Sequence, residues 1–158
     1  MISFFVPGVP KPGGSKRAFF RPGMKHPVIT DASGQPGRDW RAVVKDCAMQ
    51  AIARPPSTEN EILGFDPPTW PLEGALKLAV TFQMVRPKGH FRSGKHDSKL
   101  KPSAPDFPTG RPDATKLTRS LEDALTGILW RDDAQIVEQV IRKRYADQPG
   151  ARVTVYRV

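Results

Sequence analysis

A ten-residue stretch with a strict period of two constrains the fold more than any other part of this sequence. Between residues 76 and 85, apolar side chains stand at every second position, namely Leu76, Leu78, Val80, Phe82 and Met84. This alternation is typical of a β-strand with one buried face and one exposed face. Such a strand needs neighbouring strands for its backbone hydrogen bonds and a second layer over its apolar face.

Four further segments are predicted as strands. They cover residues 1–6, 26–30, 136–145 and 152–158, with Pro, Gly or Asp residues beside them that favour turns. We expect the last two to run antiparallel across a turn at residues 147–150. The segment at residues 54–72 contains five prolines and is predicted as a surface loop.

Two segments show the helical spacing of apolar residues. The first spans residues 38–53 and ends before Pro55; its apolar positions are Trp40, Val43, Val44, Cys47, Ala48, Ala51 and Ile52. The second begins at Asp113, in an N-cap position, and stops near Gly127; its apolar stripe is Leu117, Leu121, Ala124, Leu125 and Ile128. These elements predict an α/β (α+β) fold, a single domain over residues 1–158 in which a small mixed β-sheet packs against two main helices.

The charge of the chain indicates a polyanionic partner. Lysine and arginine number 25 against 16 aspartate and glutamate residues, so the formal net charge is +9. Nucleic acid is the usual partner of such a protein, and a merely basic soluble surface is the alternative. The single cysteine, Cys47, excludes an intramolecular disulfide and predicts a buried structural thiol. Without a membrane-spanning stretch or a signal peptide, we expect a cytoplasmic protein that binds no membrane.

Two basic segments, residues 7–25 and 86–112, have few core-forming residues and are predicted as loops. Their cations are candidates for contacts to DNA phosphates, which position a substrate without reading its sequence. These candidates are Lys11, Lys16, Arg17, Lys88, Arg92, Lys95, Lys99, Lys101 and Arg111. The three histidines, His26, His90 and His96, are predicted as phosphate or solvent contacts rather than metal ligands. A solvated basic surface without a role is the alternative.

Four carboxylates gather in one predicted helix–turn–strand unit of this cationic chain, at Asp113, Asp123, Asp132 and Asp133. Helical geometry places Asp113 and Asp123 along one flank of the apolar stripe. We expect the short connection after Gly127 to bring Asp132 or Asp133 back beside the start of the helix. Carboxylates held together repel unless a cation neutralises them, and carboxylate oxygens suit Mg²⁺. A helix cap plus a solvated turn is the alternative interpretation.

The residues of this unit resemble a known signature. The pattern Pro-Asp-x-x-Lys-Leu-x-Arg-x-x-x-Asp-Ala-Leu-Thr-Gly, followed by Trp-Arg-Asp-Asp-Ala-Gln-Ile, is similar to that of the RusA-type Holliday junction resolvases. The resemblance is strong over residues 111–137 and looser at Phe-Phe-Val-Pro-Gly-Val-Pro-Lys-Pro-Gly near the start. It implies a RusA-like fold and a homodimeric, Mg²⁺-dependent endodeoxyribonuclease of a bacterium, phage or prophage, with Mn²⁺ as a substitute metal.

The resemblance also implies roles for individual residues. Asp113 matches the first catalytic aspartate of the family, and Asp132 and Asp133 match its acidic pair. These three are the expected metal ligands and catalytic residues, with Asp123 as a further ligand. Arg119 matches a catalytically important basic residue, and Lys116 is a second candidate for stabilising the charge of the transition state.

One position departs from the family pattern. Thr115 stands where the family often has a second aspartate, two residues after the first, and a neutral hydroxyl is a weaker metal ligand. The number of metal ions and their affinity therefore stay open.

The function that the resemblance implies is Mg²⁺-dependent cleavage of four-way (Holliday) junctions in recombination and repair. Two symmetric cuts need two sites related by a two-fold axis, which a homodimer provides. The alternatives are a nuclease for other branched DNA such as flaps and forks, a DNA-binding module without catalysis, which Thr115 favours, and, more distantly, a structural or RNA-binding protein.

Overall fold

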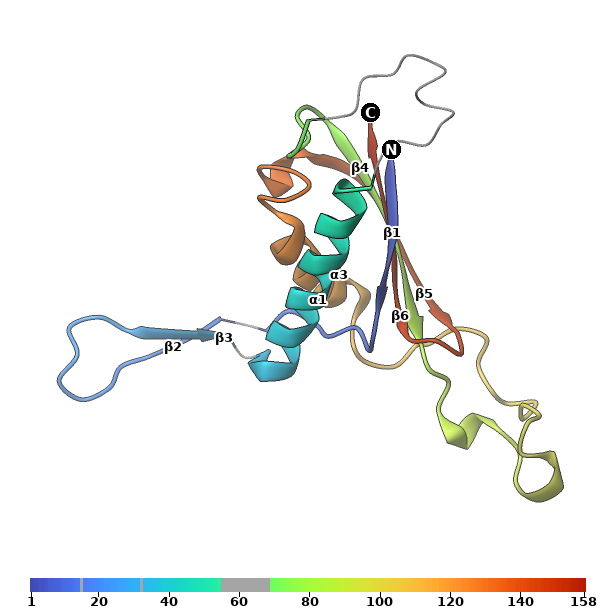
Figure 1. Cartoon of the computed structure of the whole chain (residues 1–158). Coiled ribbons are helices and arrows are strands. Elements are labelled where there is room, and N and C mark those ends of the chain that lie inside the picture. The colour runs from blue at the N-terminus through green and yellow to red at the C-terminus, as the bar shows by residue number, and fades with distance from the viewer. Residues whose placement is uncertain (15, 32, 55–68) are drawn as a thin grey trace, which may run out of the picture.

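The computed structural model describes residues 1–14, 16–31, 33–54 and 69–158, and its centre is a mixed four-stranded sheet (Figure 1). The strands are β1 (Ile2–Pro7), β4 (Leu76–Met84), β5 (Ile136–Tyr145) and β6 (Gly150–Arg157), in the order β1-β6-β4-β5. β6 is antiparallel to both of its neighbours, whereas β5 pairs with β4 in parallel. The segment with period two, β4, therefore lies inside the sheet with a partner on each side.

The last two strands, β5 and β6, run antiparallel as predicted, but they are not neighbours, because β4 lies between them. After β5, the backbone N–H of Ala146 donates to the carbonyl of Met84, 3.0 Å away, at the end of β4. The chain thus passes the end of β4 before it returns as β6. The turn residues correctly indicated a reversal of direction, but they carry no information on which strand becomes the neighbour.

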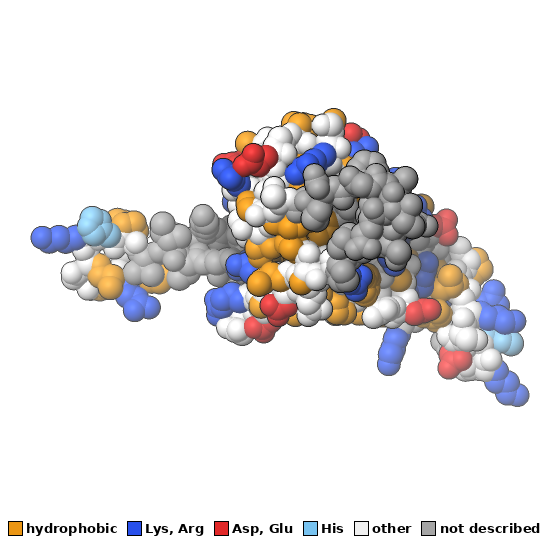
Figure 2. Space-filling view, turned by 45° about the horizontal axis from the view of Figure 1, so that its top comes forward, with side chains coloured by type: hydrophobic (Ala, Val, Ile, Leu, Met, Phe, Trp, Pro, Cys, Tyr) orange, Lys and Arg blue, Asp and Glu red, His pale blue; other side chains and the backbone are white. Residues whose placement is uncertain are grey.

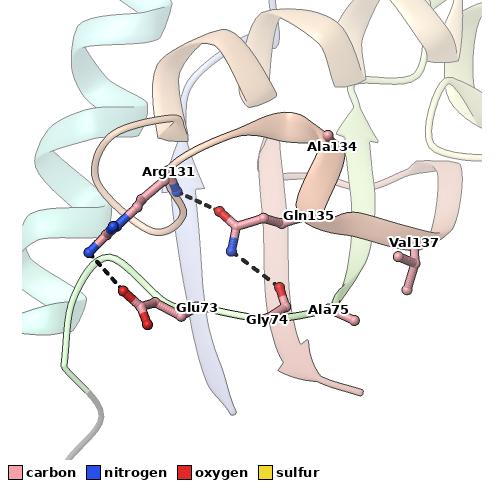
Figure 3. A pocket seen from close by; sticks show the side chains of 7 residues that line it. All are labelled: Glu73, Gly74, Ala75, Arg131, Ala134, Gln135 and Val137. Carbon is pink, nitrogen blue, oxygen red and sulfur yellow. Dashed lines mark hydrogen bonds and ion pairs between the residues drawn. The ribbon is translucent and has the colours of Figure 1, made fainter.

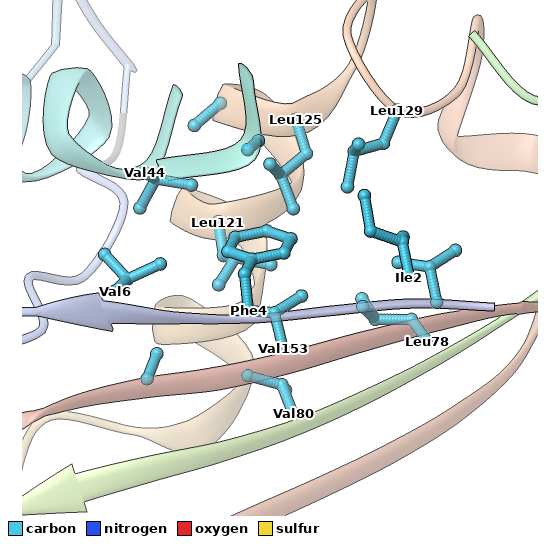
Figure 4. Close-up of a cluster of buried hydrophobic side chains, with 14 of the residues drawn as sticks. Ile2, Phe4, Val6, Val44, Leu78, Val80, Leu121, Leu125, Leu129 and Val153 are labelled. Carbon is cyan, nitrogen blue, oxygen red and sulfur yellow. The ribbon is translucent and has the colours of Figure 1, made fainter. Parts of the chain in front are cut away.

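Two helices, α1 (Gly34–Ile52) and α3 (Ala114–Leu125), cover one face of the sheet (Figures 1 and 4), as predicted. α1 begins four residues before the predicted start. Its first turn is polar and is held by side-chain hydrogen bonds from Gln35 to Asp39 at 2.6 Å and from Arg38 to Gln35 at 2.8 Å. Because this turn has no apolar periodicity, the pattern of apolar residues could not mark it.

The core lies between the helices and the sheet (Figure 4). Alternate residues of β1, β4 and β6 point toward α1 and α3, and the largest fully buried side chains include Trp130, Phe82, Leu121 and Leu125. Cys47 is half-buried against this core, and burial raises the pKa of its thiol. It is therefore a packing residue, as expected, although it is less buried than the sequence indicated.

Two arms leave the body of the domain at opposite sides (Figures 1 and 2). The hairpin arm, residues 16–31, consists of β2 (Lys16–Phe19) paired antiparallel with β3 (Val28–Asp31). The prediction of a loop over residues 7–25 is therefore wrong for β2, while the strand predicted at 26–30 is confirmed with a shift of two residues at its start. The basic loop, residues 86–112, contains two short 3₁₀ turns, Lys88–His90 and Gly94–His96, and one isolated bridge between Phe91 and Leu100, and is confirmed as a loop.

Most of the loop predicted at residues 54–72 lies outside the described residues. Of its end, Leu72 is buried and its backbone N–H donates to the carbonyl of Leu129 at 2.8 Å. Among the helices that the structure describes, none combines the length and the apolar character needed to cross a bilayer.

The close approach of β1 to the first residue of β6 gives a test of this fold. A Cβ atom at Gly150 would overlap the ring of Phe5 and lie 2.5 Å from the carbonyl oxygen of Val6. We expect Gly150→Ala to lower the free energy of unfolding by about 1–3 kcal/mol, as overpacking does in other cores. Urea unfolding measures this change. Gly89→Ala, where a Cβ meets no atom within 4 Å, is the control, and an equal effect of both changes would contradict the packing described here.

Candidate active site

Asp113 presents an uncommitted carboxylate at the start of α3. Its backbone is extended, with φ −68° and ψ 142°, and it holds the N-cap position, but its side chain makes no capping hydrogen bond. The side chain is 57% exposed, and its nearest cation is the ammonium of Lys116, at 3.7 Å. The positive end of the helix dipole stabilises a negative charge here. The predicted cap is therefore confirmed in position only, and the carboxylate remains available to a ligand.

Asp133 is held in place at the other end of α3. After the helix, Gly127 adopts φ +81° and its N–H donates to the carbonyl of Trp130, which closes a tight turn. One oxygen of Asp133, Oδ1, accepts hydrogen bonds from the indole N–H of Trp130 at 2.9 Å and from the hydroxyl of Thr126. Because Trp130 is fully buried, it fixes the orientation of this exposed carboxylate.

Asp132 has a structural role in the same turn. Its Oδ1 accepts from the backbone N–H of Ala134 at 2.8 Å and caps the short 3₁₀ helix Asp133–Gln135. Gln135 completes this capping box. Its Oε1 accepts from the N–H groups of Arg131 and Asp132, and its Nε2 donates to the carbonyls of Leu72 and Gly74. These bonds attach the acidic turn to the segment that leads into β4.

An open pocket of 630 Å³ adjoins this turn (Figure 3). It is lined by Glu73, Gly74, Ala75, Arg131, Ala134, Gln135 and Val137. The charged side chains in it, Glu73 and Arg131, form an ion pair at 2.7 Å. Neither Asp113 nor Asp133 lines this pocket, and both residues are exposed at the surface.

Glu122 is an acidic residue of this site that the sequence interpretation missed. Burial and the nearby Asp133 carboxylate, with a smaller contribution from Asp123, raise the pKa of Glu122 from 4.5 to about 7. A hydrogen bond from the side chain of Gln139 in β5 opposes this rise. The sequence feature that could have identified Glu122 is its place beside the apolar Leu121, at the border of the buried stripe. Asp123, which was predicted as a ligand instead, is exposed.

The structure separates the two ends of the predicted metal site. α3 has 12 residues, so its axis is about 18 Å long, and Asp113 lies at its start while Asp133 lies beside its last turn. The expectation that Asp132 or Asp133 returns to the helix start is wrong. Among the residues that the structure describes, no three Asp, Glu, His or Cys side chains gather closely enough to hold a metal ion.

The direction of β5 explains this separation. β5 runs back along α3, so that Gln139 near its start bonds to Glu122, and Lys143 near its end donates to the carbonyls of Gly110 and Pro112 at 2.7 and 2.9 Å. The residues that precede β5 are therefore placed at the C-terminal end of the helix.

The exposed side of α3 carries charges of both signs in separate halves. The first half exposes Lys116 and Arg119, and the second half exposes Asp123 beside the partly buried Glu122. Both basic residues predicted for catalysis thus lie on the half of the helix near Asp113.

The predicted DNA contacts fall into three groups. Six are exposed in the basic loop: Lys88, Arg92, Lys95, Lys99, Lys101 and Arg111. Lys101 also closes the basic loop, because its ammonium donates to the carbonyl of Gly89 at 2.8 Å. Lys11 is half-buried in the segment before the hairpin arm. Lys16 and Arg17 belong to β2, and their side chains lie outside the described residues.

The three histidines lie in different environments. His26 and His96 are exposed, which fits the predicted phosphate or solvent contacts. His90 is different, because its ring packs edge-on against Tyr145 with centroids 5.7 Å apart and its Nδ1 is buried. Arg86 stacks on the same Tyr145 ring at 4.0 Å and donates to the carbonyl of Pro105 at 2.7 Å. His90 and Arg86 therefore anchor the base of the basic loop.

Comparison with known proteins identifies the family. The family model described as "Endodeoxyribonuclease RusA" matches residues 7–156. The chain belongs to the RusA family. It is also 26% identical over 87 residues to the uncharacterized protein YqaN of Bacillus subtilis (strain 168). That match covers 55% of this chain and 61% of YqaN, so the two proteins correspond over part of their lengths. The mixed sheet with two helices is the fold expected from the RusA resemblance.

The raised pKa of Glu122 gives a test of the acidic pair in metal-free protein. The folded chain keeps a proton on Glu122 between pH 4.5 and about 7 that the unfolded chain loses, so stability falls as the pH rises through this window. Glu122→Gln removes this loss, and its Oε1 can still accept from Gln139. At a protein concentration that keeps the chain monomeric, we expect the variant to equal wild type at pH 4 and to be more stable at pH 8, by urea unfolding in EDTA. Asp147→Asn, in the β5–β6 connection, is the control. A gain of the same size at both pH values would argue against the repulsion between Glu122 and Asp133.

Proposed function

We propose that this chain is a divalent-metal-dependent, structure-selective endodeoxyribonuclease that cuts four-way DNA junctions as a homodimer in recombination or repair. The observation that supports the proposal best is the pair of available carboxylates at the two ends of α3, in a member of the RusA family. Neither end alone can hold a metal ion with three carboxylates. A two-fold axis across α3 would bring the ends together.

The charges of α3 support such an axis. A two-fold axis through the interface would relate the two copies of α3. If the two helices pack antiparallel, the first half of one α3 lies against the second half of the other. Lys116 and Arg119 would then face Glu122 and Asp123 of the partner subunit. This pairing would neutralise the acidic half of the helix, where one chain alone leaves the Glu122 and Asp133 carboxylates in mutual repulsion.

The same arrangement assembles two sites from shared parts. Asp113 of one chain would lie near the partner's Asp133 and the partner's Glu122, and the second site would contain the reciprocal set. Their oxygens are the donors that Mg²⁺ and Mn²⁺ prefer. Asp123 and Asp132 remain further candidate ligands, although Asp132 already caps the turn. Because Thr115 offers a hydroxyl, the proposal does not fix the number of ions.

Each group has a separate part in the proposed reaction. The carboxylates of Asp113, of the partner's Asp133 and of the partner's Glu122 would hold a divalent ion, which would supply the means to activate a water molecule and to offset the charge of the phosphate. Trp130 and Thr126 fix the Asp133 carboxylate, so that it needs little reorganisation as the phosphate is attacked. Arg119 or Lys116, both exposed on the Asp113 half of α3, would stabilise negative charge on the phosphate. No side-chain nucleophile is required.

The two arms suit a branched substrate. The basic loop and the hairpin arm extend from opposite sides of the body (Figure 2), and a dimer would present four such arms to the DNA. Flaps and forks share the branch and the duplex arms of a junction, so they are the nearest alternative substrates. We also propose, from the family resemblance, that the protein acts in the cytoplasm of a bacterium and is encoded by the host, a phage or a prophage.

Mixing two inactive variants tests the shared site. Asp113→Asn and Asp133→Asn should each abolish Mg²⁺-dependent cleavage of a synthetic four-way junction and keep binding to it. In a mixed dimer, however, one site receives both substitutions and the other receives none. With random exchange of subunits about half of the dimers are mixed, so about a quarter of all active sites are intact. We expect the mixture to regain about a quarter of the wild-type nicking activity, read from end-labelled strands.

The matched control is a mixture of either single variant with the double variant. In that mixture every active site of every dimer carries at least one substitution. An inactive mixture of the two single variants, despite verified mixed dimers, would show that each site lies within one chain. Full activity of either single variant alone would remove that residue from the site. Junction binding without cleavage by wild type, with Mg²⁺ or Mn²⁺, would favour a non-catalytic binding module.

Replacing two exposed lysines of the basic loop tests the DNA path. Lys95 and Lys99 are suitable because Lys101 also supports the loop. Changing both to Ala should weaken binding to junction and duplex alike. The slope of log affinity against log salt should fall by about 1 for each lost phosphate contact. Lys45→Ala on α1 is the control, and a wild-type salt slope in the double variant would place the DNA elsewhere.

A further inference from the structure

The tip of the hairpin arm differs from the rest of the basic surface, because it exposes large apolar side chains. Between β2 and β3, Phe20 is 70% exposed and Met24 is 52% exposed, and Phe19 at the end of β2 is 39% exposed. Phosphate contacts explain cations at such a position but not an aromatic ring and a thioether held in water. The tip therefore needs a partner with an apolar surface.

The backbone of the tip is a well-defined turn. Pro22 and Gly23 occupy its central positions, Gly23 adopts φ +87°, and the N–H of Met24 donates to the carbonyl of Arg21 at 3.1 Å. Pro at the second position and a glycine with positive φ at the third are the features of a type II turn. This turn presents Phe20 and Met24 on either side of a fixed corner, so little conformational entropy is lost when they bind.

The charge around the tip selects the kind of partner. Residues 1–30 contain five lysines and arginines, at positions 11, 16, 17, 21 and 25, and no aspartate or glutamate. Arg21 lies over the ring of Phe19, 5.7 Å from its centroid, and Lys25 is exposed beside Met24. Apolar side chains framed by cations, without acids, fit a ligand that has flat apolar surfaces along an anionic backbone. Nucleic-acid bases with their phosphates have this chemistry.

We propose that Phe20 and Met24 form a wedge that inserts against unstacked bases of the DNA substrate, while Arg21 and Lys25 hold the adjacent phosphates. The proposal rests on DNA being the substrate, and it adds a base-contacting site on an arm distant from the catalytic carboxylates. Apolar side chains of this kind partly unstack base steps in other DNA-binding proteins. A branched substrate favours such insertion, since bases at the branch are more easily unstacked than those within a duplex.

The test measures base stacking without cleavage. Four-way junctions with one 2-aminopurine, placed at the branch or inside an arm, are titrated with the full-length protein in EDTA. We expect fluorescence to rise for one or more branch positions and to stay low inside the arm. Phe20→Ala should abolish the rise and weaken junction binding about tenfold, the effect of losing roughly one stacked base. Phe20→Leu, which keeps an apolar wedge, should retain the rise.

Two controls separate insertion from general binding. Phe107→Ala removes another exposed ring, 55% exposed, from the basic loop and should leave the fluorescence unchanged. Arg21→Ala with Lys25→Ala should lower the salt dependence of binding. Because Phe20 is exposed, Phe20→Ala should unfold at the wild-type temperature, and its mass by light scattering should equal that of wild type.

The outcomes distinguish this proposal from the proposed function. Absence of junction binding by wild type would refute the function itself. Binding without a rise at any branch position, or a rise that Phe20→Ala retains, would overturn the wedge and leave the nuclease intact. A loss of dimer mass in Phe20→Ala would also overturn it, because the tip would then contact a second copy of the chain.

Discussion

The parallel pairing of β4 with β5 determines where the candidate catalytic carboxylates of this domain lie. Two parallel neighbours need a crossover between them, and here α3 provides it by running back along the sheet. The residues that enter the helix and those that leave it are consequently a helix length apart. Asp113 and Asp133 are close in sequence and share a signature, yet the topology places them at opposite ends of α3. In the proposed dimer, a two-fold axis at α3 would turn this separation into two equivalent sites.

Neighbouring carboxylates acquire different roles through their local hydrogen bonds. Asp132 and Asp133 are adjacent, but Asp132 caps a 3₁₀ turn while Asp133 is oriented by a buried indole. Glu122 differs from both in its raised pKa, because it is partly buried and lies near the Asp133 carboxylate. The side chain of Gln139 donates a hydrogen bond to it. The same residue type thus serves as cap, as oriented ligand candidate or as perturbed acid. The difference follows from which polar groups the fold brings to each oxygen.

Local patterns predicted the elements of this structure well. The period of two in β4 and the apolar stripe of α3 are properties of single segments, so the sequence was enough to locate them. The neighbours of β4 depend on contacts between distant segments, and the turn at residues 147–150 gave no information about them. The role of Glu122 also needed β5, because only the packed strand buries it. β2 was missed because it is four residues long and lies in a segment rich in Pro, Gly and basic residues.

The length of α3 has a kinetic consequence under the proposed arrangement. A chain that holds only half of each site is inert by itself, so the enzyme would be switched off by dilution rather than by an inhibitor. Well below the dissociation constant of the dimer, the cleavage rate would grow with the square of the protein concentration. A nuclease made in small amounts would then leave chromosomal branches uncut until enough subunits meet. Subunit abundance would set the threshold for cutting.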